Sequence, residues 1–180
     1  MMRSIAVGMD ILFWTFDALP LMNDQVMDDT FVSNPYRDAF YQRQAEWHGY
    51  EDASAARGKH EARIPYYQWY TQDWLPPDRS ARVLDIGCGS GQFLYFLKKQ
   101  GYRNLHGIDL DRRQVAIARE LGLDAECAEA IGYLKASSQS FDLIAMLDII
   151  EHFRRDELFP LMSAVVDALK PGGRLIASVP

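Results

Sequence analysis

The chain has 180 residues, 48% of them apolar, and a formal net charge of −6. This length is typical of one domain with a buried core. The acidic balance gives no general attraction to a phosphate backbone, so we expect no nucleic-acid partner. The two cysteines, Cys88 and Cys127, lack the spacing of a disulfide framework or a metal site, and the histidines are scattered. We therefore expect a cytoplasmic protein without a bound metal ion.

Residues 1–75 are interpreted as an N-terminal extension that ends in a helical lid. Asp10 and Asp17 interrupt the apolar run near the N-terminus. The sequence therefore predicts neither a signal peptide nor a membrane-spanning helix there, and we expect no membrane partner. Aromatic and charged residues are mixed in two segments that favour helices, 35–50 and 61–75.

From PPDRS at residues 76–80 onward, short apolar strands alternate with helices, and residues 76–180 form the predicted core. The predicted strands are 82–86, 104–109, 124–128, 141–147 and 174–179. The predicted helices are 91–101, 111–122, 129–136 and 156–170. This alternation predicts an α/β fold, in which a parallel sheet is covered by helices on both faces.

Local signals support two of these helices and one turn. Asp111 is placed to cap the helix that follows it, and Gly122 to end that helix. KPGG at residues 170–173 predicts a turn into the last strand. The final helix has an apolar face at helical spacing, made of Leu158, Met162, Val165 and Leu169.

The loop after the first predicted strand carries the strongest functional signal. RVLDIGCGSGQF places glycines at 87, 89 and 91 at the carboxyl end of that strand, where ligands bind in such sheets. A dinucleotide site favours G-x-G-x-x-G, but Gln92 stands where its third glycine would be. Asp85 is also a poor neighbour for a pyrophosphate and a good one for a cation. Asp109 is the last residue of the second strand, and its carboxylate can accept hydrogen bonds from both hydroxyls of a ribose.

Four motifs in order resemble the signatures of class I S-adenosylmethionine-dependent methyltransferases: VLDIGCGSGQF, GIDLD, FDLIAMLDIIEHF and LKPGGRLIASVP. Together they cover residues 82–180. The resemblance implies a Rossmann-like three-layer sandwich with strand order 3-2-1-4-5. Strands 6 and 7 of that fold are missing here, so we expect strand 174–179 to be an exposed edge and the core to be C-terminally incomplete.

The resemblance also assigns roles to residues of the predicted site. Asp85 and the loop backbone would hold the methionine end of S-adenosylmethionine, Asp109 the ribose, and Glu129 the adenine amino group. Glu129 stands where the family usually has Asp. Cys88 is interpreted as a small loop residue and not as a nucleophile. The full predicted donor-binding set is Asp85, Gly87, Cys88, Gly89, Gly91, Phe93, Asp109, Leu110, Glu129, Ala130, Leu147, Asp148, Tyr66 and Tyr70.

Two assignments leave alternatives open. His152 is a candidate general base oriented by Glu151, or the pair packs at a helix entry, because alignment of the reactants supplies much of the rate without a base. Tyr66 and Tyr70 form either a lid over the donor, where aromatic faces attract a sulfonium, or a buried helix face.

We therefore expect a methyltransferase that uses S-adenosylmethionine, releases S-adenosylhomocysteine, and methylates an oxygen or nitrogen of a small-molecule acceptor. Two alternatives remain. One is a donor-binding domain without catalysis. The other is an NAD-dependent oxidoreductase, which Gln92 and Asp85 disfavour.

Overall fold

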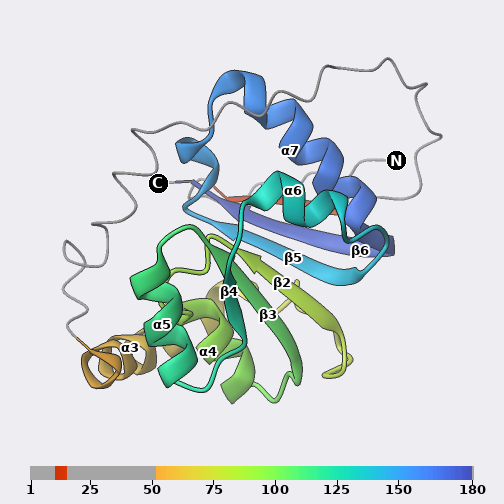
Figure 1. Ribbon diagram of the computed structural model, residues 1–180. Coiled ribbons are helices and arrows are strands. Elements are labelled where there is room, and N and C mark those ends of the chain that lie inside the picture. Colours follow the sequence, from red (N-terminus) through yellow and green to blue (C-terminus); the bar gives the residue numbers. More distant parts are fainter. Residues whose placement is uncertain (1–10, 16–51, 180) are drawn as a thin grey trace.

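A six-stranded sheet lies between two layers of helices in the computed structural model, which describes residues 11–15 and 52–179 (Figure 1). The strands are β1 (Ile11–Thr15), β2 (Arg82–Ile86), β3 (Asn104–Asp109), β4 (Ala125–Cys127), β5 (Phe141–Leu147) and β6 (Leu169–Ser178). The helices are α3 (Ala53–Thr71), α4 (Gln92–Lys99), α5 (Arg112–Glu120), α6 (Ala130–Lys135) and α7 (Arg155–Ala168), with a 3-10 turn, η1 (Ile150–His152). The helix predicted over residues 35–50 lies outside the described residues.

The strand order is β4-β3-β2-β5-β6-β1. The five strands β2 to β6 run parallel to one another, which confirms the predicted order 3-2-1-4-5. Asp85 of β2 is aligned with Gly107 of β3 on one side and with Ala145 of β5 on the other. Because parallel strands end at the same edge, the last residues of β2, β3 and β5 lie close together at the carboxyl edge of the sheet.

The prediction that strand 174–179 forms an exposed edge is wrong. β1 pairs antiparallel with β6, from Ile11 opposite Ser178 to Thr15 opposite Arg174. The backbone groups on this side of β6 therefore have a partner, and β6 is an inner strand of the sheet. The sequence of the N-terminal region shows no clean period. Nothing local therefore indicated that five of its residues would pair with a strand more than 150 residues away along the chain.

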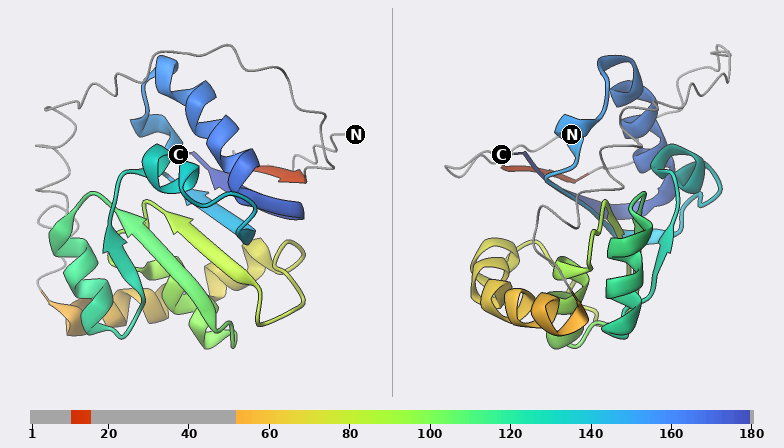
Figure 2. Two further views of the ribbon diagram at one scale, coloured as in Figure 1. Left: turned by 45° about the vertical axis from the view of Figure 1, so that its right-hand side comes forward. Right: turned by 60° about the vertical axis from the view of Figure 1, so that its left-hand side comes forward.

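The helices divide between the two faces of the sheet. Figure 2 shows α3, α4 and α5 on one face and α6 and α7 on the other. One core cluster joins α6 and α7 to the sheet through Leu134, Leu161 and Val165. On the opposite face every residue of Phe93–Leu97 is buried, because α4 is enclosed between the sheet and α3.

The helix boundaries correct several predictions. α3 begins eight residues before the predicted segment, where Asp52 caps it by accepting a hydrogen bond from Ala55 N–H (2.8 Å), and ends at Thr71 instead of residue 75. Asp111 caps α5 as predicted, accepting from Arg113 N–H at 2.8 Å. Among residues 11–15 and 52–179, no helix is long and apolar enough to cross a membrane.

The apolar face of α7 is rotated relative to the prediction. Its fully buried residues are Leu161, Ala164, Val165 and Ala168, so only Val165 is shared with the predicted face. Leu158 and Met162 lie at the margin of the contact and are half-buried. Leu169 is the first residue of β6, since this strand begins before the predicted KPGG turn and is irregular around Gly172, where φ is +78°.

Candidate functional site

One pocket lies at the carboxyl edge of the sheet, where the loop after β2 meets the ends of β3 and β5 and the start of α6. It is lined by Tyr67, Asp85, Ile86, Gly87, Cys88, Gly89, Ser90, Gln92, Phe93, Ile108, Asp109, Leu110, Gln114, Ala128, Glu129, Ala130, Leu147, Asp148, Ile149, His152 and Phe153. The topology explains this position. Ligands in such sheets bind outside the carboxyl ends of the strands at the switch point, which is the place where the strand order reverses.

The glycine loop forms the floor of this pocket. Gly87 and Gly89 have φ values of +71° and +54°, which side chains other than glycine adopt only with strain. A Cβ at Gly87 would lie 2.7 Å from Ile149 Cγ1, and one at Gly89 would lie 2.8 Å from Gln114 Oε1. The loop is therefore a cradle in which a ligand can approach the backbone closely and in which side chains would collide with their neighbours.

Carboxylates dominate the polar lining of the pocket. Asp85, Asp109, Glu129 and Asp148 all line it, and no lysine or arginine is among the described lining residues. Burial raises the pKa of Asp85 well above its usual value, and the neighbouring Asp109 raises it further. Burial also raises the pKa of Asp109, whose carboxylate is withdrawn from water although part of the residue is exposed. A cation bound here would relieve the cost of holding these carboxylates together.

Asp109 is oriented by the backbone around it. Its Oδ2 accepts a hydrogen bond from Gly89 N–H at 2.8 Å, and its Oδ1 accepts from Asp111 N–H at 2.8 Å. Each carboxylate oxygen can accept a second bond. Asp109 thus ties the glycine loop to the end of β3 and keeps acceptor capacity for a ligand hydroxyl.

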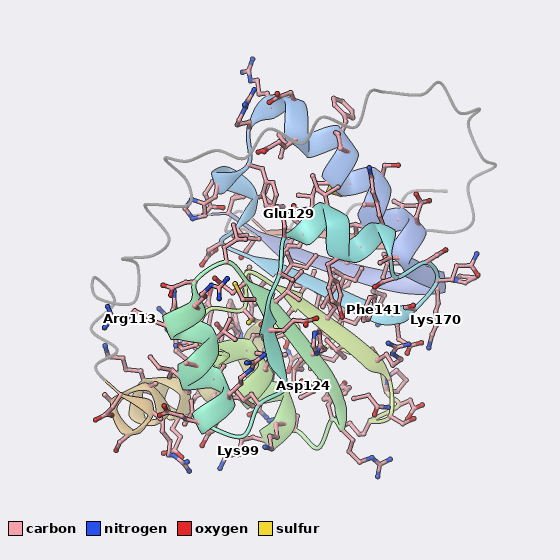
Figure 3. The ribbon with its side chains drawn as sticks, in the orientation of Figure 1. Lys99, Arg113, Asp124, Glu129, Phe141 and Lys170 are labelled. Atoms are coloured by element: carbon pink, nitrogen blue, oxygen red, sulfur yellow. The ribbon has the colours of Figure 1, made fainter. Side chains whose placement is uncertain are left out.

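Glu129 has a second task besides lining the pocket. It caps α6, with Oε1 accepting from Ile131 N–H at 2.8 Å and Oε2 accepting from Gly132 N–H at 2.7 Å. Figure 3 shows Glu129 at the start of α6, with the labelled basic residues Lys99, Arg113 and Lys170 well away from it. These two bonds hold the carboxylate against the helix end, so it reaches the pocket from a defined position.

At the end of β5, Asp148 has a left-handed backbone with φ of +53°. Its N–H donates to Ser178 O at 3.1 Å, and its Oδ1 accepts from Ser178 Oγ at 2.8 Å. Such a conformation is uncommon outside glycine and persists where the surroundings hold it. Here β6 holds Asp148, and with it the adjoining Leu147, at the mouth of the pocket.

His152 and Glu151 both belong to η1, but only His152 lines the pocket. The Nε2 atom of His152 lies 3.8 Å from Glu151 Oε1, which is within ion-pair range and beyond hydrogen-bond range. The side chains are partly exposed, at 31% and 30%. The imidazole of His152 therefore lies in the pocket lining, and the carboxylate of Glu151 lies near it outside that lining.

The aromatic contribution from α3 is Tyr67, which sequence reasoning did not select. Its ring packs 5.3 Å from that of Phe93, and both residues line the pocket. Tyr66 and Tyr70 stack on each other at 5.2 Å and are not among the lining residues. Because helical residues one position apart point about 100° away from each other, the segment alone did not show which tyrosine faces inward.

Gly91 and Cys88 of the glycine loop have different surroundings, and only Gly91 lies outside the pocket lining. Gly91 caps α4 and is buried behind the pocket wall, beside Leu123. Cys88 lines the pocket and is buried, and burial together with Asp85 raises the pKa of its thiol well above the usual value. It is therefore a protonated packing residue, as its sequence context indicated. Of the expected donor set, the pocket brings together Asp85, Gly87, Cys88, Gly89, Phe93, Asp109, Leu110, Glu129, Ala130, Leu147 and Asp148.

Comparison with known proteins gives a consistent family. A family model described as a methyltransferase domain matches residues 83–173, or 91 of the 180 residues. A ubiquinone biosynthesis O-methyltransferase of Xylella fastidiosa is 38% identical over 112 residues, covering 57% of this chain and 43% of that protein. The protein of the same name from Agrobacterium fabrum is 30% identical over 107 residues, covering 57% and 42%. The chain thus spans less than half the length of these curated relatives.

Solved structures share the fold. The PH0226 protein of Pyrococcus horikoshii superposes with a TM-score of 0.54 at 26% identity, covering 68% of this chain and 57% of that one. An N-methyltransferase of Haemonchus contortus, solved in complex with S-adenosylhomocysteine, has a TM-score of 0.53 at 25% identity, covering 63% of this chain and 32% of that one. The cyclase SpnF has a TM-score of 0.56 at 26% identity, covering 65% and 44%. With the family match over half of its length, the chain belongs to the class I S-adenosylmethionine-dependent methyltransferases.

Proposed function

We propose that the protein transfers a methyl group from S-adenosylmethionine to a hydroxyl oxygen of a small-molecule acceptor and releases S-adenosylhomocysteine. The observation that carries this proposal is the lining of the pocket. A glycine cradle at the switch point is surrounded by four carboxylates and by no described lysine or arginine. S-adenosylmethionine carries an ammonium and a sulfonium and has no phosphate, so its charge complements this lining.

The same lining argues against an NAD-dependent oxidoreductase. A pyrophosphate would bring two negative charges next to Asp85, which is buried with only 3% of its surface exposed. Charges of like sign in a poorly solvated site repel strongly, and no lysine or arginine is among the described lining residues to compensate. Gln92 also occupies the place of the third glycine in the dinucleotide fingerprint.

Different residues of the pocket would bind different parts of S-adenosylmethionine. Asp109, already held by two backbone bonds, would accept hydrogen bonds from the ribose, and Leu110 and Ala130 would pack on the adenine. Asp85 and the loop backbone would hold the methionine end. When bound, S-adenosylmethionine supplies a methyl group activated by the positive sulfur. Tyr67 and Phe93 would present aromatic rings at this end of the pocket, where a sulfonium is attracted by about 0.5–2 kcal/mol per ring.

His152 is the group that we assign to the acceptor. Its ring lines the pocket, and its Nε2 lies 3.8 Å from Glu151 Oε1. An acceptor hydroxyl would give its proton to Nδ1 as its oxygen bonds to the methyl carbon. The bond from that carbon to sulfur would break in the same step, and S-adenosylhomocysteine would leave. Glu151 would then stabilise the imidazolium. The names of the curated relatives support oxygen as the methylated atom, since both are O-methyltransferases.

The donor is tested by titration calorimetry with S-adenosylhomocysteine and with NAD. We expect binding of the first and none of the second. Asp109→Ala should weaken S-adenosylhomocysteine binding by about 1.5–3 kcal/mol, the scale of hydrogen bonds to a charged group. Asp124→Ala is the matched control, because Asp124 is exposed and precedes β4 at the opposite edge of the sheet. Equal affinities in the two variants would contradict the role of Asp109.

The acceptor is tested by methyl transfer from labelled S-adenosylmethionine to a panel of phenols, alcohols and amines. We expect products only from hydroxyl compounds. His152→Gln should lower turnover by about 10²–10⁴, the usual contribution of a general base. His106→Gln is the control, because His106 pairs with Asp124 and Glu126 outside the pocket lining. Near-full turnover of His152→Gln would remove the base from the mechanism.

A donor-binding protein without methyl transfer is the second candidate. The structural likeness to SpnF, which is described as a [4+2]-cyclase, favours it, because this fold also occurs in a protein described by another chemistry. It predicts binding of S-adenosylhomocysteine with no labelled product from any acceptor. The calorimetric and transfer assays together therefore distinguish the two candidates.

A further inference from the structure

His60 is a buried histidine that the proposed mechanism does not use. It lies on α3, is 0% exposed, and is not among the residues that line the pocket. Its Nε2 is 3.0 Å from the Oγ of Ser90, which is 3% exposed. Burial lowers the pKa of His60 to about 4, so the ring is neutral near pH 7. A hydrogen bond between two buried polar groups from distant segments is costly to break and therefore specifies their relative position.

Ser90 belongs to the glycine loop, and the loop depends on such bonds for its shape. Gly87, Gly89 and Gly91 provide no side chains to pack, and each has a positive φ. Toward the sheet, Gly89 N–H is held by Asp109 Oδ2 at 2.8 Å. Toward α3, Ser90 is held by His60. The loop is thus anchored on both sides, and one of these anchors comes from the N-terminal helix.

A second bond connects the same face of α3 to the start of α4. Tyr67 is seven residues after His60, two helical turns along, and its hydroxyl donates to Gln92 Oε1 at 3.0 Å. Ile64 lies between them on this face and packs against both clusters of buried residues on this side of the sheet. Tyr67 and Gln92 line the pocket, as does Ser90. The docked face of α3 therefore contacts the donor site at two places, Ser90 and Gln92.

We propose that His60 is a positioning residue, which holds the glycine loop in its donor-binding shape through Ser90 and so makes donor affinity depend on the docking of α3. This inference rests on the proposed function, because it needs the glycine loop to bind S-adenosylmethionine. It adds a role for a residue outside the pocket and for the helix that precedes the core.

The test is calorimetric binding of S-adenosylhomocysteine to the full chain and its variants. Ser90→Ala and His60→Phe each remove the bond, and each should weaken binding about tenfold. The double variant should be about as weak as either single one, because the same bond is lost. His60→Gln keeps a side-chain amide near the position of Nε2 and should recover affinity to within about threefold of wild type.

Tyr95→Phe is the matched control. The Tyr95 hydroxyl donates to Glu61 Oε1 at 2.9 Å, so this variant also removes a bond between α3 and α4, but one that does not touch the loop. Its affinity should stay within about twofold of wild type. Ser90→Ala is a small change in a loop, so it provides the measurement even where His60→Phe fails to fold.

The outcomes separate this inference from the proposed function. Tight binding by wild type with tenfold losses in Ser90→Ala and His60→Phe supports the positioning role. Binding by wild type that is unchanged in folded Ser90→Ala overturns it and leaves the proposed function standing. Equal losses in Tyr95→Phe also overturn it, because the effect would then belong to α3 packing in general. Absence of binding by wild type overturns both.

Discussion

Replacing Gly91 by alanine should destabilise the fold through two separable effects. Gly91 has a φ of +82°, and a Cβ there would lie 2.4 Å from Leu123 Cδ1 and 3.3 Å from Ala118 Cβ. The left-handed backbone costs a residue with a Cβ about 1–2 kcal/mol. Forcing a methyl group into a packed site costs about 1–3 kcal/mol more. We therefore expect Gly91→Ala to lower the free energy of unfolding by about 2–5 kcal/mol.

Gly101→Ala isolates the first effect. Gly101 has a φ of +90°, but a Cβ there would meet no atom of residues 11–15 or 52–179 within 4 Å. Its alanine variant should therefore lose only about 1–2 kcal/mol, the backbone cost alone. Urea unfolding of wild type and both variants at one temperature measures the difference.

The cost of the clash at Gly91 can then be tested by replacing Leu123, the nearest neighbour of the added Cβ. In a Leu123→Ala background the nearer neighbour of an added Cβ is gone and Ala118 Cβ remains at 3.3 Å. The added cost of Gly91→Ala should therefore fall towards the level of Gly101→Ala. Equal destabilisation by Gly91→Ala and Gly101→Ala in the wild-type background would refute the reasoning. It would mean that Leu123, although only 6% exposed, can move aside at no cost.

Three further predictions concern buried groups outside the loop backbone. Burial lowers the pKa of His60 from 6.5 to about 4, so the unfolded chain binds a proton in this window that the folded protein does not. The free energy of unfolding should therefore decrease by up to about 3 kcal/mol as the pH is lowered from about 6.5 to about 4. Urea unfolding at several pH values measures this, and an equal decrease in the His60→Gln variant would contradict it. Tyr102, 2% exposed, donates to Pro76 O, so Tyr102→Phe should cost about 1–3 kcal/mol in the same assay, and an unchanged midpoint would argue against it. A thiol reagent should modify exposed Cys127 in the native protein and Cys88 only after unfolding, because burial raises the Cys88 pKa; two equally fast thiols would disprove the assignment.

The strand order and the place of the pocket could be predicted from the sequence. Each of the five core strands is a short segment between helices that ends at a loop or cap residue, and this alternation is a local pattern. The glycines of the loop and Asp109 occur at the ends of β2 and β3. Because parallel strands end at one edge, their proximity follows from the order of the elements.

The same pattern could not predict which side of a helix packs against the rest of the protein. Tyr66, Tyr67 and Tyr70 lie on one aromatic segment, and only packing against α4 brings Tyr67 to the pocket. On α7 the buried stripe is shifted from the predicted one for the same reason. A helix with several apolar directions is oriented by its neighbours, which the local sequence does not specify.

By itself, the sequence determined the alternating fold, the glycine loop and the acidic character of the site, because these depend on backbone preferences and on residues close together in the chain. The tertiary structure alone decided that β1 completes the sheet beside β6 and that His60 meets Ser90. These contacts join segments far apart in the chain. Their formation depends on which buried surfaces and hydrogen-bonding groups match once the chain is compact, and no local pattern records that match.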